Sequence, residues 1–439
     1  MNEREVMEFL ERAGRAGIVP GLDSIRELCR RLGDPQKMLK FVHVAGTNGK
    51  GSVSAYISSV LRTAGYRVGK YISPAIFEYR ERIQVNDRMI TKKSLSQGME
   101  KIRLICEEMT AEGLPHPTTF EIETALGFLY FHEKHCDIVV LETGMGGLLD
   151  ATNIVENTEV AVLASISMDH MTYLGKSLEE IAKQKAGVIK PACAVVSACQ
   201  APEAMRVIRE RAAEVNCPLT VAVSEQVTHI KYGLKRQCFD YAGMKKLEIS
   251  LAGKFQIENA ALAVEALLAL CGKGFPVSEE QLRRGLLETR WEGRFTVIGD
   301  HPLFIVDGAH NEDAAKRLVE SLEFYFTNRQ IIYIMGVLKD KEYEKIISRT
   351  YSRAAYIITV TPPGNPRALT AYELALAAAR FHSKVTAVDS LEEAVEMSRL
   401  LAGREGVIVA FGSLSYLGRL MEVAGGPFGK AAKKHGGSR

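Results

Sequence analysis

Short, unbroken apolar runs alternate along the chain with longer stretches in which apolar residues recur every three or four positions. The first pattern is typical of strands buried in a parallel sheet, and the second of amphipathic helices. In the first half of the chain, helical spacing covers 2–33 (as two short helices), 52–64 and 119–135, and apolar runs lie at 41–45, 67–73, 136–142 and 160–166. This alternation predicts an α/β domain with a mostly parallel sheet.

The same alternation returns towards the C-terminus, where each apolar run precedes helical sequence. These runs lie at 303–307, 330–337, 354–360, 384–388 and 406–412. Between the halves we expect a strand and a helix after Cys193, a β-ribbon over 219–250, and a long helix over 256–271. Residues 290–300 hold the only Trp and two glycines and predict a hinge. We therefore expect domains at 1–292 and 293–425.

The composition is that of an ordinary soluble protein, with 46% hydrophobic and 25% charged residues over 439 positions. A net charge of +3 is small for this length and argues against a nucleic-acid or membrane-surface partner. We expect the basic stretch 426–439 to be a flexible tail. The eight cysteines form no C-x-x-C pair, which indicates reduced residues in the cytoplasm. No signal peptide and no membrane span are expected, because no apolar run approaches ~20 residues.

A glycine-rich turn follows the first apolar run and ends in Lys50 and Ser52 (41-FVHVAGTNGKGS-52). Glycines at 46, 49 and 51 allow backbone amides to turn around an anion at the start of a helix. Lys50 would pair with the outer phosphates of a nucleotide, and the Ser52 hydroxyl would bind magnesium. The spacing departs from the strict G-x-x-x-x-G-K-[ST] pattern, so a simple glycine-rich strand-to-helix turn is the alternative.

Two further strand ends carry polar residues. Glu142 ends an apolar run just before a Gly-rich turn, and His170 follows the next run, ahead of a capping box at 177–180 and Lys185. Because Ser52, Glu142 and His170 follow successive strands of one predicted sheet, we expect them to converge on a metal–phosphate site. The turn 144–149 fails the dinucleotide pattern G-x-G-x-x-G, because Leu149 occupies the last glycine position.

Other polar segments are ambiguous by themselves. Residues 80–82 (RER) suit a solvated loop or a substrate loop equally, and Asn259 on the long helix suits a surface or capping position. Asp307 and His310 end the first strand of the second domain, where polar residues indicate a site rather than core.

Together, several motifs resemble the folylpolyglutamate synthase and dihydrofolate synthase family of the Mur ligase superfamily, over nearly the whole chain. They are GLDSIRELCRRLGDPQ, HVAGTNGKGS, YISPAIFEYRERIQVN, LETGMGGLLDATN, SISMDH, KQKAGVIK, WEGRF, IVDGAHN, PGNPRAL and FGSLSYLG. The resemblance implies a Mur-ligase-like P-loop ATPase domain with a mostly parallel sheet, followed by a smaller Rossmann-like glutamate ligase domain. It also accounts for the short cradle, which is the form this superfamily uses.

The resemblance implies an ATP-dependent ligase that adds L-glutamate to a folate through an acyl phosphate, with tetrahydrofolate or dihydropteroate as acceptor. It assigns the catalytic roles to Lys50, His170 and Lys185. Two Mg²⁺ ions would be held by Ser52, Glu142, His170 and Lys185, with Lys185 carbamylated. Carbamylation needs a neutral, desolvated amine and turns a cation into an oxygen ligand. The implied ATP-binding residues are Asn48, Gly49, Lys50, Gly51, Ser52, Asn259, Arg294, Asp307 and His310.

For the acceptor and glutamate, the resemblance implies Ser73, Arg82, Thr118, Phe120, Asp150, Arg367 and Ser413. Phe120 suits a stacking role and an ordinary core role about equally. Close relatives often carry Arg where this chain has Leu148, although the LDATN run resembles bifunctional bacterial enzymes, which favours both activities.

Four alternatives are open. A monofunctional folylpolyglutamate synthase would use tetrahydrofolate alone. A cell-wall Mur ligase would carry a nucleotide-sugar domain before the cradle, where only some forty residues precede Gly46. A P-loop ATPase switch would hydrolyse ATP without ligation, and the failed fingerprint disfavours a cofactor-dependent oxidoreductase. We expect a monomer.

Overall fold

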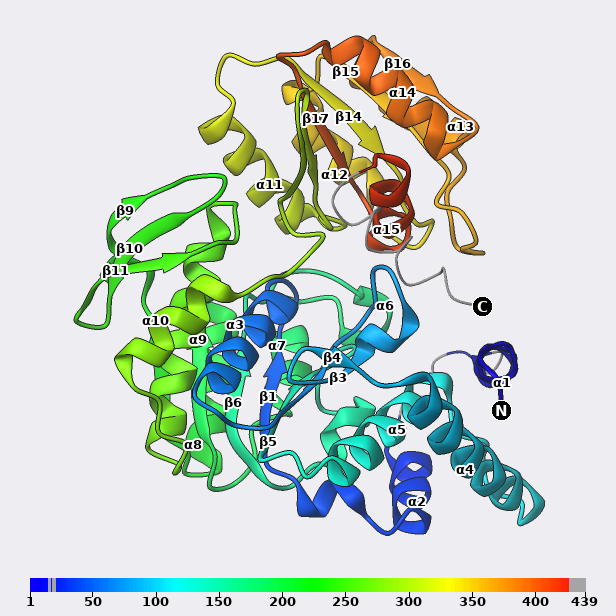
Figure 1. Ribbon diagram of the computed structural model, residues 1–439, viewed down its shortest axis with the longest axis vertical. Coiled ribbons are helices and arrows are strands. Elements are labelled where there is room, and N and C mark those ends of the chain that lie inside the picture. The colour runs from blue at the N-terminus through cyan, green and yellow to red at the C-terminus, as the bar shows by residue number, and fades with distance from the viewer. Residues whose placement is uncertain (15–16, 18–20, 426–439) are drawn as a thin grey trace. The chain divides into compact units, whose positions relative to one another are not determined.

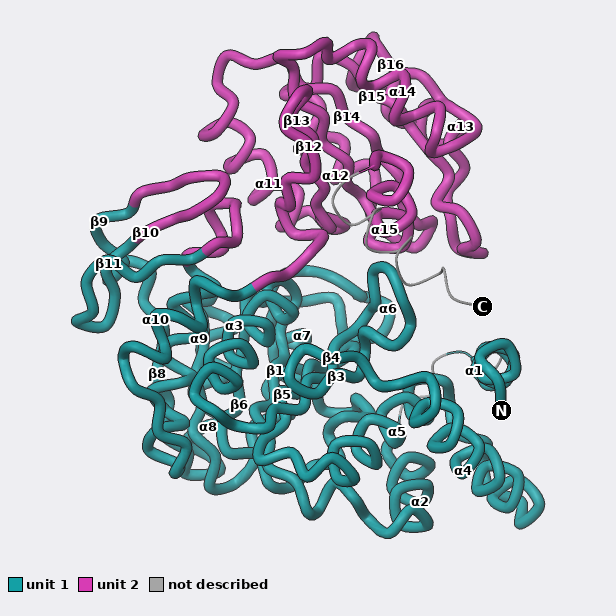
Figure 2. The backbone as a smooth tube through the Cα atoms, in the orientation of Figure 1, with its two compact units in different colours: residues 1–230, 239–249, 258–289 teal, residues 231–238, 250–257, 290–439 magenta. Residues whose placement is uncertain are grey.

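The computed structural model describes residues 1–14, 17 and 21–425, which divide into two compact units (Figure 2). Unit 1 comprises Met1–Ile230, Phe239–Ile249 and Glu258–Thr289; unit 2 comprises Lys231–Cys238, Ser250–Ile257 and the chain from Arg290 onward. Each unit is described by itself. The tail expected at 426–439 lies outside the described residues.

Unit 1 is built on an eight-stranded sheet with the order β4-β3-β2-β5-β1-β6-β7-β8 (Figure 1). Its strands are β1 Phe41–Ala45, β2 Val68–Tyr71, β3 Ile83–Val85, β4 Arg88–Met89, β5 Ile138–Glu142, β6 Thr158–Leu163, β7 Ala194–Ala198 and β8 Leu219–Ala222. From β2 to β8 along this order, all neighbouring strands pair parallel. Strand β3 pairs antiparallel with both β2 and β4. The predicted α/β class with a mostly parallel sheet is confirmed.

One predicted element is wrong. The ribbon expected over 219–250 begins too early, because β8 pairs parallel with β7, with Val195 opposite Leu219. The helix between these two strands gives the connection that a parallel crossover needs. The ribbon proper is a small three-stranded sheet of β9 Thr228–Lys231, β10 Gln237–Tyr241 and β11 Met244–Ile249.

Ten helices accompany these sheets in the described residues up to 289 (Figure 1). They are α1 Glu3–Gly14, α2 Asp23–Arg31, α3 Lys50–Thr63, α4 Lys92–Ala111, α5 Thr119–Glu133, α6 Met171–Leu174, α7 Leu178–Ala186, α8 Pro202–Glu214, α9 Phe255–Cys271 and α10 Glu279–Glu288. The capping box predicted at Ser177 and Glu180 starts α7. Helix α3 crosses α10 closely, since a Cβ on Gly285 would lie 2.5 Å from the Val60 Cα.

Unit 2 contains a six-stranded sheet with the order β12-β13-β17-β14-β15-β16. Its strands are β12 Thr296–Asp300, β13 Leu303–Val306, β14 Ile331–Met335, β15 Tyr356–Thr359, β16 Val385–Ala387 and β17 Val407–Phe411. Its helices are α11 Glu312–Tyr325, α12 Tyr343–Thr350, α13 Ala371–Ala379, α14 Leu391–Ala402 and α15 Leu414–Val423. The five strands predicted for this region are present and pair parallel.

The hinge predicted over 290–300 is wrong in its second half, which forms strand β12. This strand pairs antiparallel with β13 and has a register shift between Val297 and Gly299. A glycine at such a bulge bends the strand, so the residue that suggested a hinge marks an irregular strand instead.

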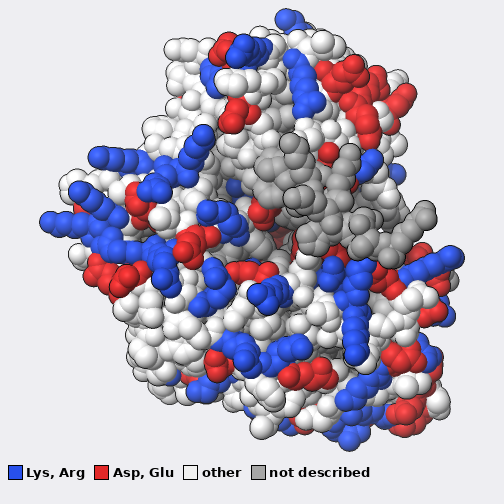
Figure 3. Space-filling model, in the orientation of Figure 1, with Lys and Arg blue, Asp and Glu red and all other residues white. Residues whose placement is uncertain are grey.

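The surface charges and the cysteines of the described residues match what the composition predicts. Lys and Arg side chains are interspersed with Asp and Glu on the face shown in Figure 3. All eight cysteines are free thiols. Among residues 1–14, 17 and 21–425, no helix is long and apolar enough to cross a membrane.

Candidate functional site

The turn between β1 and α3 requires glycine at two positions. Gly46 has a φ of +156°, and a Cβ there would lie 2.8 Å from the Ala164 Cβ. Gly49 has a φ of +88° and forms the N-cap of α3, and a Cβ there would lie 2.6 Å from Oδ1 of Asn259. Because the left-handed turn at Gly49 starts the helix, α3 begins at Lys50 rather than at the predicted Ser52.

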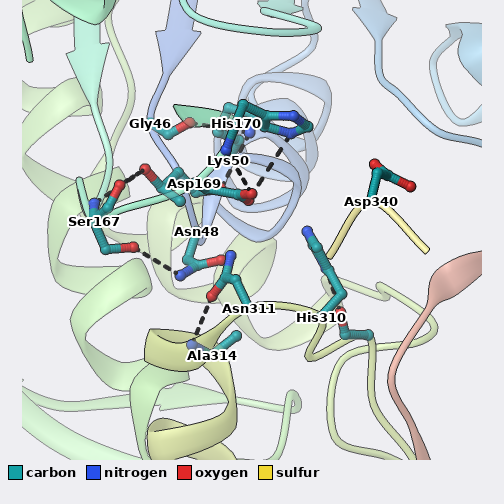
Figure 4. A network of polar contacts seen from close by, with 12 residues as sticks. Gly46, Asn48, Lys50, Ser167, Asp169, His170, His310, Asn311, Ala314 and Asp340 are labelled. Carbon is teal, nitrogen blue, oxygen red and sulfur yellow. Dashed lines mark hydrogen bonds and ion pairs between the residues drawn. The ribbon is translucent and has the colours of Figure 1, made fainter. Parts of the chain in front are cut away.

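A neighbouring loop holds this turn in place. The Thr47 hydroxyl donates to the Ser167 carbonyl (2.9 Å) and accepts from the Ser167 amide (3.0 Å). The amides of Thr47 and Asn48 both donate to the carbonyl of Ser165, and Asn48 Nδ2 donates to Ser167 Oγ at 3.4 Å (Figure 4). The turn therefore presents the first residues of α3, where backbone N–H groups and the helix dipole favour an anion.

Two lysines donate to the same carbonyl of the turn. Lys50 Nζ lies 3.1 Å from the Gly46 oxygen and 3.3 Å from the Thr47 oxygen. Lys185 Nζ, on α7, lies 2.8 Å from the same Gly46 oxygen. Burial, together with the nearby charge of Lys50, lowers the pKa of Lys185 to about 7. Lys185 is thus a desolvated amine, as carbamylation would require.

The predicted metal-binding residues lie at the carboxyl ends of adjacent strands. Glu142 is the last residue of β5, is 4% exposed, and pairs with Val44 of β1. Ser52 is 2% exposed on the first turn of α3, which follows β1. His170 follows β6, on the other side of β1, with a φ of +50°; its Nε2 lies 3.9 Å from Asp169 Oδ2 (Figure 4). The expected placement of these residues at successive strand ends is confirmed.

The donor chemistry of these residues suits magnesium. A hydroxyl oxygen and a buried carboxylate are the hard oxygen ligands that Mg²⁺ prefers. Within the part of the chain that the structure describes, no group of three or more His, Cys, Asp or Glu side chains could hold a metal by itself.

Asn259 reaches the turn from a helix far along the chain. It lies on α9, and its Oδ1 approaches the backbone of Gly49 closely, since a Cβ added to Gly49 would lie 2.6 Å from it. The sequence alone suggested a surface or capping residue, and only the family resemblance placed it at the nucleotide. Sequence reasoning missed Thr47, Ser167 and Asp169; their only signal was their place next to the strand ends of β1 and β6.

The residues assigned to the acceptor are held by local interactions. Thr118 caps α5 in a capping box with Glu121. Phe120 packs partly buried against the core, 6.1 Å from the Tyr71 ring, and a Cβ on Gly144 would collide with its ring. Phe120 therefore contacts the core and still keeps some exposed surface. Ser73 lies half-buried just after β2.

Asp150 ties together the turn that follows Glu142. Its Oδ2 accepts from the Met145 amide at 2.7 Å, and its Oδ1 accepts from the Thr152 amide (3.1 Å) and hydroxyl (2.6 Å). Burial raises the pKa of this carboxyl, while these hydrogen bonds act in the opposite direction. The Thr152 hydroxyl also lies 2.9 Å from Nε2 of buried His43 on β1, so Asp150 connects the turn to the central strand.

In unit 2, Asp307 and Arg294 lie close together. Asp307 follows β13, is buried, and accepts from the amides of Phe295 and Ala309, both at 2.8 Å. Burial raises the pKa of Asp307 to about 6, against the opposing effect of Arg294. The backbone of Gly308 lies against the Arg294 guanidinium, since a Cβ there would lie 2.2 Å from Nη1 of Arg294.

The other unit 2 candidates are arranged locally. His310 Nδ1 lies 2.7 Å from the Gly308 carbonyl, which can only accept, so Nδ1 carries the proton. Arg367 pairs with Asp340 at 3.3 Å on the surface. Ser413 is buried and caps α15. Asn311 caps α11 by accepting from the Ala314 amide, a role that the sequence analysis did not assign (Figure 4).

The geometry of Gly49 gives a first prediction. Gly49→Ala places a methyl group against Asn259 and forces a left-handed φ on alanine, so we expect about 1–3 kcal/mol of destabilisation and weaker nucleotide binding. Urea unfolding and titration with a non-hydrolysable ATP analogue measure both effects. Gly65→Ala, at a φ of +97° with open space around it, is the matched control for backbone strain alone. Equal nucleotide affinity in the two variants would contradict the prediction.

Comparison with known proteins shows that the chain is similar to Mur ligases. The Mur ligase middle domain matches residues 44–267, and the Mur ligase, glutamate ligase domain matches residues 293–414. The chain is 36% identical to the dihydrofolate synthase/folylpolyglutamate synthase of Bacillus subtilis over 413 residues, covering 91% of this chain and 94% of that protein.

Two solved structures are similar in fold over almost the full chain. Folylpolyglutamate synthase of Mycobacterium tuberculosis, complexed with ADP and AMPPCP, superimposes with a TM-score of 0.87 at 27% identity, covering 99% of this chain and 98% of that chain. Escherichia coli FolC, in complex with DHPP and ADP, superimposes with a TM-score of 0.84 at 28% identity, covering 98% of each chain.

Proposed function

Because the chain belongs to the folylpolyglutamate synthase/dihydrofolate synthase family of Mur ligases, we propose that it joins L-glutamate to folates in an ATP-dependent reaction. The observation that carries this proposal is the buried amine of Lys185, which donates to the Gly46 carbonyl of the phosphate turn. A nucleotide switch needs the turn but has no need of a desolvated lysine beside it.

ATP is the nucleotide of this proposal. The relatives from Mycobacterium tuberculosis and Escherichia coli were solved with ADP or an ATP analogue, which supports the assignment. In this chain the triphosphate would bind at residues 48–52, with Asn259 beside Gly49. We assign Arg294, Asp307 and His310 to ATP binding as well. The division into domains 1–292 and 293–425 belongs to the proposal, and the glutamate ligase match at 293–414 supports it.

Magnesium would be held by Ser52, Glu142, His170 and a carbamylated Lys185. When bound, it neutralises phosphate charge and orients the γ-phosphate. The lowered pKa of Lys185 supports carbamylation, because only the neutral amine reacts with carbon dioxide. A hydroxyl, a carboxylate and a carbamate together supply oxygen ligands of the right kind.

The residues of the chain account for the remaining chemistry. A carboxylate is a poor electrophile, so the acceptor carboxylate first attacks the γ-phosphate in line and gives an acyl phosphate and ADP. Lys50, at the start of α3, offsets the negative charge that collects on the phosphate oxygens. The glutamate amine then attacks the acyl carbon, and phosphate leaves as the amide forms.

The acceptor side of the site would include Ser73, Arg82, Thr118, Phe120 and Asp150, and the incoming glutamate would meet Arg367 and Ser413. For Asp150, the hydrogen bonds to its own turn support a role in shaping that turn. We propose both dihydropteroate and tetrahydrofolate as acceptors, as the combined name of the Bacillus subtilis relative suggests. We also propose a monomer, located in a reducing cytoplasm, with which the free cysteines agree.

Glutamate-dependent phosphate release tests the function directly. Purified protein with ATP and Mg²⁺ is given glutamate and either dihydropteroate or tetrahydrofolate, and products are identified by mass. Turnover with both acceptors is expected. Turnover with tetrahydrofolate alone would identify a monofunctional synthase, and ATP hydrolysis that ignores both substrates would support the switch alternative.

Leu148→Arg is expected to shift the acceptor ratio by several-fold, because Leu148 follows the turn 144–147 and is 45% exposed, which leaves room for a cation near the acceptor. The ratio of kcat/KM for the two acceptors measures the effect. Leu149→Arg, which is 48% exposed next to it, is the matched control. An unchanged ratio in Leu148→Arg would remove this residue from acceptor selection.

A further inference from the structure

The loop at residues 73–82 leaves the sheet beside the candidate site. Strand β2 precedes the loop and pairs parallel with β5, with Tyr71 opposite Leu141. The loop therefore starts at the same sheet edge at which Glu142 ends β5. Loops at this edge bind ligands in open α/β sheets. This loop carries Phe77, an exposed aromatic residue.

One carboxylate organises the middle of this loop. Glu81 accepts hydrogen bonds from three consecutive backbone amides: Oε2 from Ile76 (2.8 Å), Oε1 from Glu78 (3.1 Å), and both oxygens from Phe77 (3.2 and 3.3 Å). Side-chain carboxylates elsewhere in the described chain cap helices in a similar manner, but here the capped segment precedes only a short 3₁₀ turn. The Glu81 hydrogen bonds therefore hold the loop rather than a long helix.

Two arginines at the C-terminal end of the loop are fixed to other elements. Arg82 donates to Glu123 of α5 at 2.7 Å, and Glu123 is buried. Burial raises the pKa of Glu123, while the charge of Arg82 lowers it. Arg80 donates to the Ile90 carbonyl at 3.0 Å. At the start of the loop, directly after β2, the Ile72 amide donates to the Arg82 carbonyl at 3.1 Å. With both flanks held in this way, the conformation of residues 76–78 depends on the Glu81 carboxylate.

We infer that Glu81 is a positioning residue for the acceptor: its carboxylate holds residues 76–78 so that Phe77 faces the ring system of the folate or pteroate. This inference rests on the proposed function. Glu81 itself touches no reacting atom in this assignment. An aromatic side chain on a held loop offers a flat apolar surface at low cost in conformational entropy, which suits the flat pyrimidine ring of a reduced pterin.

Glu81→Gln tests the role with little change in volume. The amide keeps one acceptor oxygen, but its NH₂ group faces backbone N–H groups that need an acceptor. Charge-assisted bonds to the loop are lost, so we expect the KM for the acceptor to rise about tenfold. The KM for ATP and kcat at saturating acceptor should stay within twofold, since the loop does not form the phosphate turn. Glu81→Asp, which keeps the charge but shortens the reach, should give a smaller rise.

A second readout reports loop order without any substrate. Trypsin cleaves after arginine, and Arg80 lies within the loop, so cleavage at Arg80 should be several-fold faster in Glu81→Gln than in the wild type. Glu393→Gln is the matched control, because Glu393 also accepts a backbone amide, from Asp389, ahead of helix α14. The control should change neither the acceptor KM nor cleavage at Arg80, and thermal unfolding checks that all variants fold.

Two results would overturn the inference: an acceptor KM within twofold of wild type, or a matching rise in the KM for ATP, which would indicate general damage to the site. Failure of the proposed function can be distinguished from failure of the Glu81 inference. If the wild type does not ligate glutamate to either acceptor, the assignment of a folate ligand falls, whereas the Arg80 cleavage rates still decide whether Glu81 holds the loop.

Discussion

Lys185→Ala is expected to lower kcat for ligation by roughly 10³-fold, because several kcal/mol of phosphate-charge stabilisation would be lost with a metal-binding carbamate. Lys185 is buried, and its amine lies 2.8 Å from the Gly46 carbonyl, at the turn that we assign to the triphosphate. The lowered pKa leaves a substantial neutral fraction at pH 7, which is the reactive form. Phosphate release with saturating ATP, glutamate and acceptor measures the loss.

Chemical rescue separates the carbamate from a packing role. A short-chain carboxylic acid in the buffer should restore part of the activity of Lys185→Ala, because it returns an oxygen ligand to the vacated volume. Lys183→Ala, on the same helix but exposed, is the matched control and should retain activity without added acid. Full activity of Lys185→Ala without acid would refute the carbamate, and low activity that no acid restores would favour a structural role.

The strands and the central residues of the site were predictable because their signals are local. Buried parallel strands give continuous apolar runs, and the ends of neighbouring parallel strands meet at one edge. The sequence therefore predicted Glu142 and His170 at the ends of strands, and the structure places these strands on either side of β1, which leads into the Gly46–Gly49 turn. The capping box at Ser177 was equally visible, since its residues are three apart.

Other features depend on contacts that the sequence does not display. Strand β12 has a bulge at Gly299, so its sequence suggested a hinge. Asn259 meets Gly49 through the packing of a helix far along the chain. Glu81 suited a solvated loop and a substrate loop equally, because its hydrogen bonds go to backbone amides, which no residue pattern identifies. In each case the decisive partner is either distant in sequence or part of the main chain.

The site assignment also predicts that a substitution of Glu142 lowers the rate of the reaction but has little effect on acceptor binding. Glu142→Gln preserves the volume at the buried end of β5 but removes the negative charge, so we expect kcat to fall about 10²-fold and the Mg²⁺ concentration for half-maximal rate to rise. The acceptor Kd should stay within about threefold, because the residues that we propose for the acceptor lie on α5 and on the loops that follow β2 and β5. Phosphate release at several Mg²⁺ concentrations and acceptor binding by fluorescence measure the two effects.

The proposed role of Glu142 requires that turnover and acceptor binding respond differently to its substitution. Glu142→Ala should show the same pattern with an added loss of stability from the cavity it leaves. Glu214→Gln, on the exposed end of α8 beside Arg211, is the control for removing one carboxylate and should behave as wild type. Equal losses of Mg²⁺-dependent turnover and acceptor binding in Glu142→Gln would make Glu142 a structural residue, because a carboxylate that only stabilised the sheet edge would disturb both sides of the site together.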